Sequence, residues 1–202
     1  VATNVTCLCE HLHGAIVKRL GFGGVLDVGC GKGYLLSRLQ SPHRELYGID
    51  ISPAVIKWAK VSAPETSLCV ADVKNLPFKS DSFDWLICTE VLEHIEGDEA
   101  IQECFRVLKS GGRALFTVPN KSGPQEVKTV EHVRSFTFAS FAEYVQQAGF
   151  EIVSARKMGL YIPILTYTLR VLSGVINKNI PLAHPLGISV PEFLAANFFI
   201  EC

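Results

Sequence analysis

The residues of this chain with the most distinctive chemistry form a glycine-rich run. The run reads Asp27-Val28-Gly29-Cys30-Gly31-Lys32-Gly33, and it lies between a short apolar segment and a predicted helix. Glycines in such a turn let the backbone approach a ligand closely, and the amino end of the helix adds positive potential. The dinucleotide fingerprint G-x-G-x-x-G would require glycine at position 34, where this chain has Tyr34. The run therefore predicts a ligand-binding turn of another kind, and an ordinary strand–helix turn is the simpler alternative.

Two more carboxylates follow the next apolar segments. Asp50 lies in the run YGIDIS and Asp72 lies in the run VADV. A carboxylate at the end of a strand can accept hydrogen bonds from both hydroxyls of a ribose. One such acid alone is more often a helix cap or a solvated loop residue. With Asp27, however, there are three, each at the carboxyl end of a successive predicted strand. Open α/β sheets bind ligands at that edge, so the acids predict one shared crevice.

A second group of polar residues lies farther along the chain. Glu90, Glu93 and His94 are spaced i, i+3, i+4 and would share one face of a helical turn. His132 follows the fifth predicted strand and so belongs to the same edge of a parallel sheet. Two carboxylates and two imidazoles suit a divalent metal. Two alternatives stay open, namely a metal-free role of His132 as a base or orienting group, and a purely structural turn. His94 and His132 are the candidate catalytic residues, and no metal ligand is assigned.

Short apolar segments alternate with amphipathic ones around these residues. The short segments are rich in Val, Ile, Leu and Phe and are mostly apolar on both faces, as parallel strands covered by helices are. Strands that alternate with helices predict a βαβ sheet with right-handed crossovers. The predicted strands are Gly24–Val28, Glu45–Ile51, Ser67–Ala71, Phe83–Cys88, Arg113–Val118, Phe150–Ala155 and Ala195–Glu201.

Three helices are predicted from capping residues and apolar faces. Ser52, followed by proline, opens a helix over Ala54–Lys60. The stretch Ile101–Leu108 carries apolar residues at i, i+3, i+4 and i+7, and Gly111-Gly112 are expected to stop this second helix. A third helix is predicted from its cap at Thr137 to Gly149.

Composition narrows the class of protein. The chain has 202 residues, is 48% hydrophobic and 19% charged, and has a net charge of −1. These values predict a single domain over residues 1–202 and exclude a disordered chain. Because no dense Lys/Arg run is present, electrostatics do not support a nucleic-acid partner. The seven cysteines are scattered, which favours reduced thiols in the cytoplasm over a disulfide framework.

A long apolar stretch sets the last part of the chain apart. Residues 158–176 include one charged residue, Arg170, and approach the length of a membrane span. Arg170 near the middle and Pro163 oppose a span. We expect an apolar lid or insert at about 159–192 instead. Contact of 158–176 with a membrane surface is the alternative.

Four runs of the chain resemble the successive motifs of class I S-adenosylmethionine (SAM)-dependent methyltransferases, in particular the methyltransferase type 11 group. The resemblance covers about Gly24 to Ala155 and is specific for cofactor and fold rather than for substrate. It implies an α/β fold, a Rossmann-like three-layer sandwich with a mostly parallel seven-stranded sheet and an antiparallel last strand. The runs are VLDVGCGKG, YGIDIS, VADVKNLPFKSDSFDWLICTEVLEHI and VLKSGGRALFTVPN.

The same resemblance implies how the glycine-rich loop holds the cofactor. Asp27, Gly29 and Gly31 would line the methionine end of SAM, and the family expects an acid where Asp27 stands. Cys30 and Gly33 complete the cofactor-binding loop. Cys30 fills a position that varies within the family, so a role as nucleophile is not expected.

Residues after the next strands would hold the rest of the cofactor. The resemblance implies that Asp50 binds the ribose hydroxyls and that Ile51 packs against the adenine. Asp72 would accept a hydrogen bond from the adenine amino group, beside the backbone of Val73. The backbone of Thr89–Glu90 would lie under the methionine moiety.

The expected function is methyl transfer from SAM to a small or amphiphilic acceptor, with O-methylation favoured and S-adenosylhomocysteine as product. The runner-up is a metal-assisted O-methyltransferase acting on a vicinal diol. Glu90, Glu93, His94 and His132 resemble the metal ligands of small-RNA 3′-end and ubiquinone-pathway O-methyltransferases. The net charge of −1 disfavours RNA as acceptor. A non-catalytic SAM-binding protein is a third alternative. The acceptor and the oligomeric state stay open.

Overall fold

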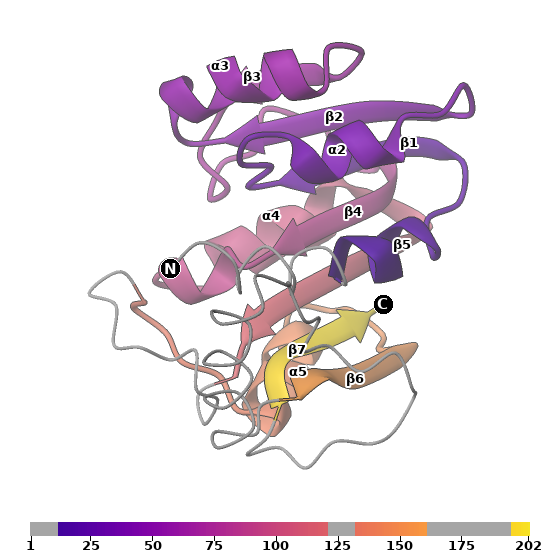
Figure 1. Cartoon of the computed structure of the whole chain (residues 1–202). Helices are drawn as coiled ribbons and strands as arrows, with labels where there is room; N and C mark the ends of the chain where they lie inside the picture. The colour runs from indigo at the N-terminus through magenta and orange to yellow at the C-terminus, as the bar shows by residue number, and fades with distance from the viewer. Residues whose placement is uncertain (1–11, 121–131, 161–194) are drawn as a thin grey trace, which may run out of the picture.

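A seven-stranded sheet forms the centre of the protein in the computed structural model, which describes residues 12–120, 132–160 and 195–202 (Figure 1). The strand order is β3-β2-β1-β4-β5-β7-β6. Neighbouring strands from β3 to β5 pair in parallel, and β7 pairs antiparallel with β5 and β6. The predicted fold with its antiparallel last strand is therefore confirmed. The strands are β1 (Gly23–Val28), β2 (Arg44–Asp50), β3 (Ser67–Val70), β4 (Phe83–Thr89), β5 (Leu108–Pro119), β6 (Ser154–Leu160) and β7 (Ala195–Glu201).

Helices cover both faces of the sheet and create two separate cores. Successive strand residues point to opposite faces, so Leu86 joins one core and Ile87 the other. The core that contains Leu86 is closed by α4 (Glu99–Val107) and α5 (Phe138–Gln147). The other core is closed by a helical stretch at 12–17 together with two further helices. These are α2 (Tyr34–Leu39) and α3 (Pro53–Ser62), and a 3-10 turn, η1 (Leu92–His94), follows β4.

Two of the predicted helices begin at the expected caps. The Ser52 hydroxyl accepts a hydrogen bond from the backbone N–H of Val55 at 3.4 Å, with Pro53 in the first turn of α3. Thr137 and Ser140 form a reciprocal capping box at the start of α5. Each cap satisfies backbone donors that the first turn of a helix leaves without a partner.

Two predicted boundaries are wrong. The helix expected to stop at Gly111-Gly112 ends at Val107, and both glycines lie within β5. The reason is strand pairing, because Leu108 is already paired with Phe83 of β4. The strand predicted over Phe150–Ala155 begins only at Ser154. Phe150 is apolar because its side chain is buried in the core formed with α4 and α5.

Strand direction decides where the chemistry gathers. The parallel strands β1, β2 and β4 all end at the same edge of the sheet, on the left in Figure 1. Because β7 runs the other way, its first residues belong to that edge too, and Asn197 pairs with Pro119 at the end of β5. Of the apolar stretch expected at 159–192, only residues 159 and 160 are described, as the end of β6. Within the described residues, no helix has the length and apolar character needed to cross a membrane.

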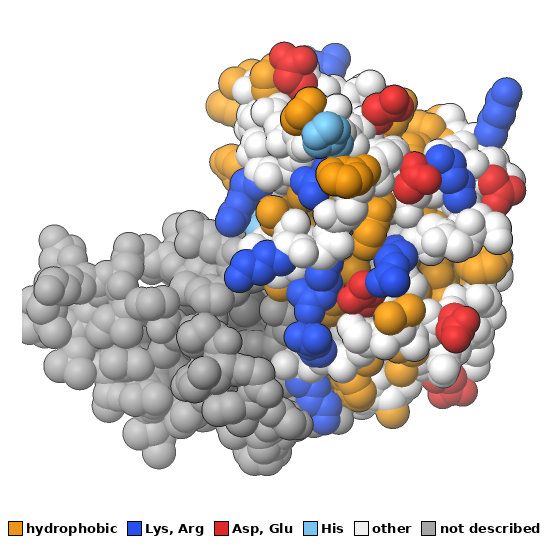
Figure 2. All heavy atoms as spheres, turned by 90° about the vertical axis from the view of Figure 1, so that its right-hand side faces the viewer, with side chains coloured by type: hydrophobic (Ala, Val, Ile, Leu, Met, Phe, Trp, Pro, Cys, Tyr) orange, Lys and Arg blue, Asp and Glu red, His pale blue; other side chains and the backbone are white. Residues whose placement is uncertain are grey.

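The opposite edge, where the parallel strands begin, carries charges of both signs (Figure 2). Several of them form ion pairs. Lys109 pairs with Asp84 at 2.9 Å, and Arg113 pairs with Glu201 at 2.8 Å. The Arg44 guanidinium instead donates to three backbone carbonyls. These contacts tie the strand starts to their neighbours, away from the candidate site.

Candidate functional site

The glycine-rich loop follows β1 and adopts a backbone that favours glycine. Gly29, Gly31 and Gly33 have φ angles of 73°, 53° and 76°. A Cβ on Gly29 would lie 2.3 Å from Cγ2 of Val91, so internal packing also requires glycine there. A Cβ on Gly31 would meet no protein atom within 4 Å. The bare backbone of Gly31 therefore faces open space, which suits close approach of a ligand.

Cys30 contributes to the shape of this loop rather than offering a reactive thiol. Its side chain is buried among apolar residues, and burial raises the pKa of the thiol far above its usual range. Its N–H donates to the Ile49 carbonyl at 2.8 Å, and its own carbonyl accepts from Gly33 at 3.0 Å. A thiolate is the nucleophilic form of cysteine, so the buried thiol is unreactive.

Asp50, the last residue of β2, joins this strand to the glycine-rich loop. One carboxylate oxygen accepts from the N–H of Gly31 at 3.1 Å, and the other accepts from Ser52 at 2.9 Å. An ionised carboxylate has about four lone-pair sites, so both oxygens keep capacity for ribose hydroxyls. The neighbouring Ile51 is 70% exposed, so its side chain is accessible to a ligand at this edge.

Asp27 lies inside β1, directly below the loop. Its side chain is only 2% exposed, and burial, followed by the negative charge of Asp50, raises its pKa to about 7. No ion pair among the described residues involves Asp27. A cationic group placed beside it would favour the carboxylate form. The site is therefore electrostatically suited to a ligand with positive charge.

Asp72 and Val73 follow β3 at the same edge. The exposed Asp72 carboxylate accepts from the N–H of Lys74 at 2.9 Å, and its carbonyl accepts from Asn75 at 3.0 Å. This side-chain turn fixes the backbone just after the strand. Val73, the next residue, is buried in the core beside this turn.

Glu90 directly follows Thr89 at the end of β4 and has a left-handed backbone with φ 55°. Its N–H donates to the Thr117 carbonyl at 3.0 Å. One carboxylate oxygen accepts from the Thr117 hydroxyl and the other from the Asn197 amide, both at 2.8 Å. Burial raises the pKa of the Glu90 carboxyl. The expected helical face shared with Glu93 and His94 is wrong, since η1 begins only at Leu92.

Glu93, His94 and His132 form a group of side chains that could hold a metal ion. One ligand atom from each lies within 4.8 Å of the others. The His94 Nε2 is 3.7 Å from a Glu93 carboxylate oxygen, and the two imidazole rings meet edge to face at 4.9 Å. Glu93 is 2% exposed, and burial, followed by the charge of Glu90, raises its pKa to about 8.

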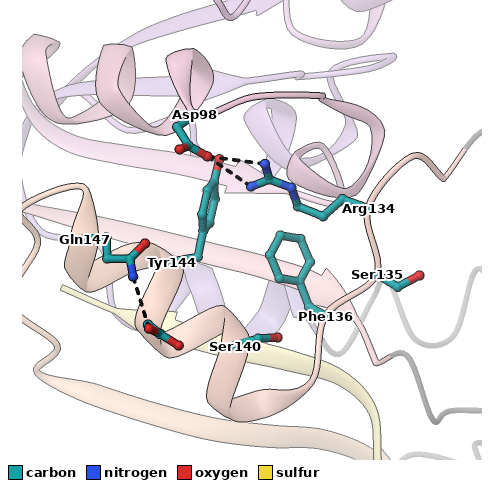
Figure 3. Close-up of a pocket in the computed structure, with 8 residues that line it drawn as sticks. Asp98, Arg134, Ser135, Phe136, Ser140, Tyr144 and Gln147 are labelled. Carbon is teal, nitrogen blue, oxygen red and sulfur yellow. Dashed lines mark hydrogen bonds and ion pairs between the residues drawn. The ribbon is translucent and has the colours of Figure 1, made fainter.

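The segment after His132 is anchored to η1 and α5. The N–H groups of Val133 and Arg134 both donate to the Glu93 carbonyl at 3.0 Å. The Arg134 guanidinium lies 4.5 Å from the centre of the Tyr144 ring and pairs with Asp98 at 3.3 Å (Figure 3). These residues line a surface cavity of about 370 Å³. The contacts place His132 beside η1, although 38 residues separate it from His94 in the sequence.

Comparison with known proteins shows which family the chain resembles. Residues 26–116 match the methyltransferase domain family. The chain is 28% identical over 148 residues to a probable S-adenosylmethionine-dependent methyltransferase of Mycolicibacterium smegmatis, covering 71% of this chain and 58% of that protein. The chain is therefore similar to the class I SAM-dependent methyltransferases in sequence. The cofactor of this family is SAM.

Two further methyltransferases show the range of the similarity. The chain is 32% identical over 156 residues to a ubiquinone biosynthesis O-methyltransferase of Alkalilimnicola ehrlichii, covering 69% of this chain and 59% of that protein. A solved SAM-dependent methyltransferase of Thermotoga maritima, titled a possible histamine N-methyltransferase, superposes with a TM-score of 0.73 at 18% identity. That match covers 96% of this chain and 88% of the other, and it shows the fold alone. The chain spans a little over half the length of the two curated relatives.

Two residues of the candidate site were missed in the sequence. Thr117 and Asn197 are both buried and hold the Glu90 carboxylate. Asn197 is 107 residues away from Glu90 in the sequence. The available signal was the antiparallel direction of the last strand, which brings its first residues to the cofactor edge.

Proposed function

We propose that this chain transfers a methyl group from SAM to a hydroxyl group of a small or amphiphilic acceptor and releases S-adenosylhomocysteine. The observation that carries the proposal is the open face of Gly31, between Asp27 and Asp50 at the carboxyl edge of the sheet. When bound, SAM supplies a methyl group activated by its positively charged sulfur. The residues around the loop would bind and orient it, with Asp50 on the ribose and Asp27 near the positive charge.

The acceptor side of the proposal uses the imidazoles of His94 and His132. An acceptor hydroxyl must lose its proton during the transfer, and a histidine is the usual base near neutral pH. The Glu93 carboxyl lies 3.7 Å from His94, so an imidazolium formed at His94 would favour the ionised form of Glu93 and be stabilised by it. The relative from Alkalilimnicola ehrlichii is named as an O-methyltransferase, which also favours oxygen as the acceptor atom. Holding acceptor and cofactor in line would supply most of the rate.

The surroundings of the activity form part of the proposal. The five cysteines in the described part of the chain are free, which fits a reducing cytoplasm. A net charge of −1 supports a small-molecule acceptor over a nucleic acid. The apolar composition of residues 158–176 supports an amphiphilic acceptor or contact with a membrane surface.

A binding and turnover experiment tests the proposal. SAM is titrated into the protein by calorimetry, and S-adenosylhomocysteine formation is then followed with catechol-like and amphiphilic hydroxylated acceptors. We expect binding, and turnover that His132→Ala abolishes while His43→Ala, at an exposed histidine on the opposite edge, leaves unchanged. Absence of SAM binding would refute the cofactor assignment. Binding without turnover on any acceptor would instead favour a non-catalytic SAM-binding protein.

A second candidate is metal-assisted O-methylation of a vicinal diol, which the close grouping of Glu93, His94 and His132 favours. These residues fit a divalent cation in type, since carboxylate and imidazole both bind such ions. In this structure, Glu90 is directed to Thr117 and Asn197 instead. The group would hold the ion, which would grip neighbouring hydroxyls of the acceptor.

Chelation separates the two candidates. If a metal is required, exhaustive chelation abolishes turnover, leaves SAM binding intact and has the same effect as His132→Ala. Added Mg²⁺, Mn²⁺ or Zn²⁺ then restores turnover in the wild type only. If turnover survives chelation while His132→Ala abolishes it, His132 acts as a base or orienting group and the metal is excluded.

A further inference from the structure

The connection from β3 to β4 consists of turns and bends over residues 71–82. Such a segment lacks the regular backbone pairing of a helix or a sheet, so its buried polar groups must be satisfied in other ways. At its centre, Leu76 is 3% exposed and packs into the core. Its N–H donates to the Glu103 carboxylate at 2.7 Å. The Glu103 carboxylate of α4 therefore accepts the hydrogen bond that a helix or strand partner would otherwise provide.

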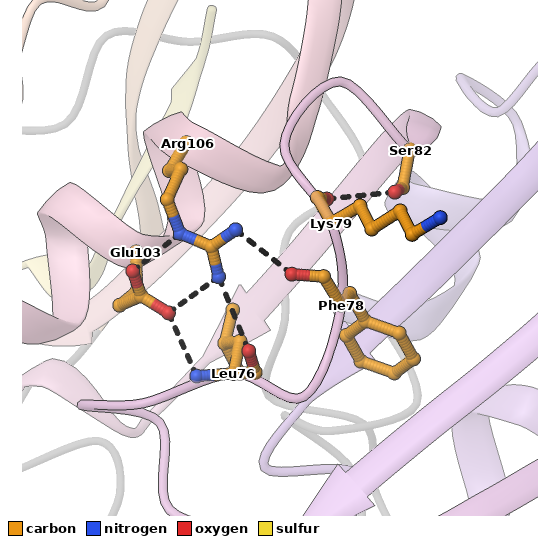
Figure 4. Close-up of polar contacts among 6 residues, drawn as sticks. All are labelled: Leu76, Phe78, Lys79, Ser82, Glu103 and Arg106. Atoms are coloured by element: carbon orange, nitrogen blue, oxygen red, sulfur yellow. Dashed lines mark hydrogen bonds and ion pairs between the residues drawn. The ribbon is translucent and has the colours of Figure 1, made fainter.

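Arg106, one turn farther along α4, holds the same connection from its carbonyl side. Its guanidinium donates to the Phe78 carbonyl at 2.8 Å and to the Leu76 carbonyl at 3.1 Å (Figure 4). It also forms a two-pronged ion pair with both oxygens of Glu103. Only a planar guanidinium can make these contacts together. The backbone carbonyl of Arg106 adds a contact, because it accepts from Asp81 at 3.1 Å.

The Glu103–Arg106 clamp, defined by these two side chains, begins where the Asp72 turn ends. The Asp72 turn fixes Lys74 and Asn75, and the clamp fixes the next residue, Leu76. Hydrogen bonds therefore hold each residue from Lys74 to Leu76, so the Asp72 turn is connected to α4 through consecutive fixed residues. The hydrogen bond from Arg106 also lowers the pKa of the Glu103 carboxyl, so the clamp stays charged at neutral pH.

We propose that Glu103 and Arg106 are positioning residues that set adenine selectivity by holding Asp72 and Val73 in register with the cofactor base. This inference rests on the proposed function, in which Asp72 accepts from the adenine amino group. Neither clamp residue touches the cofactor. Loss of the clamp frees the connection, and the Asp72 carboxylate then no longer has one fixed direction.

The test compares two ligands whose bases differ at position 6, where an oxo group replaces the adenine amino group, and at the adjoining N1, which carries a proton in the oxo form. S-adenosylhomocysteine and S-inosylhomocysteine are titrated by calorimetry into the wild-type chain, Arg106→Met and Glu103→Gln. We expect the wild type to prefer the adenosyl ligand by about tenfold or more, the value of one hydrogen bond to a charged group. Arg106→Met should reduce that preference to about twofold, mostly by weakening the adenosyl ligand, and Glu103→Gln should give an intermediate value. Arg106→Lys keeps the positive charge but lacks the planar guanidinium, so it should not restore the preference for the adenosyl ligand.

Lys109→Met is the matched control, because it breaks an ion pair with Asp84 close to α4 but away from the connection. It should keep the wild-type preference. A ratio of affinities is insensitive to a fraction of unfolded protein, so a purely structural role leaves it unchanged. Wild-type selectivity in both Arg106→Met and Glu103→Gln overturns the inference. Equal binding of the two ligands by the wild type overturns the inference but not the proposed function. No binding of either ligand by the wild type overturns both.

Discussion

The cofactor side and the acceptor side of the site treat their acidic residues differently. On the cofactor side, Asp27 is buried, but Asp50 and Asp72 are at least partly exposed and accept hydrogen bonds from nearby backbone N–H groups. On the acceptor side, Glu93 is buried with a raised pKa, and the imidazoles of His94 and His132 lie beside it. The carboxylates of Asp50 and Asp72 therefore act as hydrogen-bond acceptors whose direction is already fixed by the backbone. The acceptor side holds a carboxyl in a costly environment, which a proton, a metal or an imidazolium would relieve.

The residues of the two sides are positioned by different kinds of contact. The loop around Gly31 and Asp50 is positioned by backbone conformation and short contacts within two adjacent strands. The acceptor side is assembled from η1, the segment at His132 and the start of β7, through contacts between distant parts of the chain. Perturbations of the first side should therefore act on SAM affinity. Perturbations of the second should act on turnover and on the pH dependence of turnover.

The largest effect is expected from Gly31→Val. A side chain there meets no protein atom but occupies the open face of the loop, so SAM should no longer raise the melting temperature. Gly111→Val is the matched control, since Gly111 has a φ of 75° and equally open surroundings but lies in β5. Both variants should lose about 1–2 kcal/mol of folding free energy from the left-handed backbone. A SAM-dependent shift that persists in Gly31→Val would show that the cofactor lies elsewhere.

Asp50→Ala should have the next largest effect. Removing the ribose acceptor should weaken SAM binding by about 1.5–3 kcal/mol, measured by calorimetry. The fold should persist, because the partly exposed carboxylate contacts only Gly31 and Ser52. Glu65→Ala, at an exposed acid between α3 and β3, serves as control and should bind SAM normally. Equal affinities for the two variants would contradict the assignment of Asp50.

Asp27 should give SAM binding a pH dependence. Its pKa of about 7 in the free protein means that the carboxyl is largely protonated below neutrality. A cationic ligand binds the ionised form better, so SAM affinity should fall as the pH drops from 7 to 5.5, by at most about tenfold per unit. Asp27→Asn should bind weakly with little pH dependence over this range. An undiminished slope in Asp27→Asn would assign the dependence to another group.

The smallest effect concerns the stability of the protein without ligand. The Glu93 carboxyl has a pKa of 4.5 in an unfolded chain and about 8 in the fold. Its protonated form is thus favoured by folding, and its contribution to stability is present below pH 4.5 and is lost as the pH rises through about 8. In urea unfolding between pH 6 and 9, Glu93→Gln should flatten this decline in the free energy of unfolding. Glu96→Gln, at an exposed residue close to the turn, should leave the decline unchanged. An identical decline in Glu93→Gln would argue against a buried neutral carboxyl.

Much of the cofactor side was predictable because it is local. The positive φ angles at positions 29, 31 and 33 favour glycine, so these positions can be recognised in the sequence. The end of a strand and the start of a helix likewise favour polar residues such as Asp50 and Ser52. A backbone conformation constrains the residues that adopt it, so its signal lies within a few positions. The sequence by itself therefore determined the loop, most strand positions, the caps of α3 and α5, and the resemblance to the family.

Only the tertiary structure decided which distant residues meet. Glu90 contacts Asn197 because β7 lies beside β5 and is antiparallel to it. Arg106 contacts Leu76 because α4 packs against the connection from β3. The glycines that were expected to end a helix became part of β5 once Leu108 paired with β4. Such contacts depend on strand order and direction, which no short stretch of sequence encodes. The physical reason is that a long-range contact is selected by the packing of the whole core, whereas a turn is selected by the residues within it.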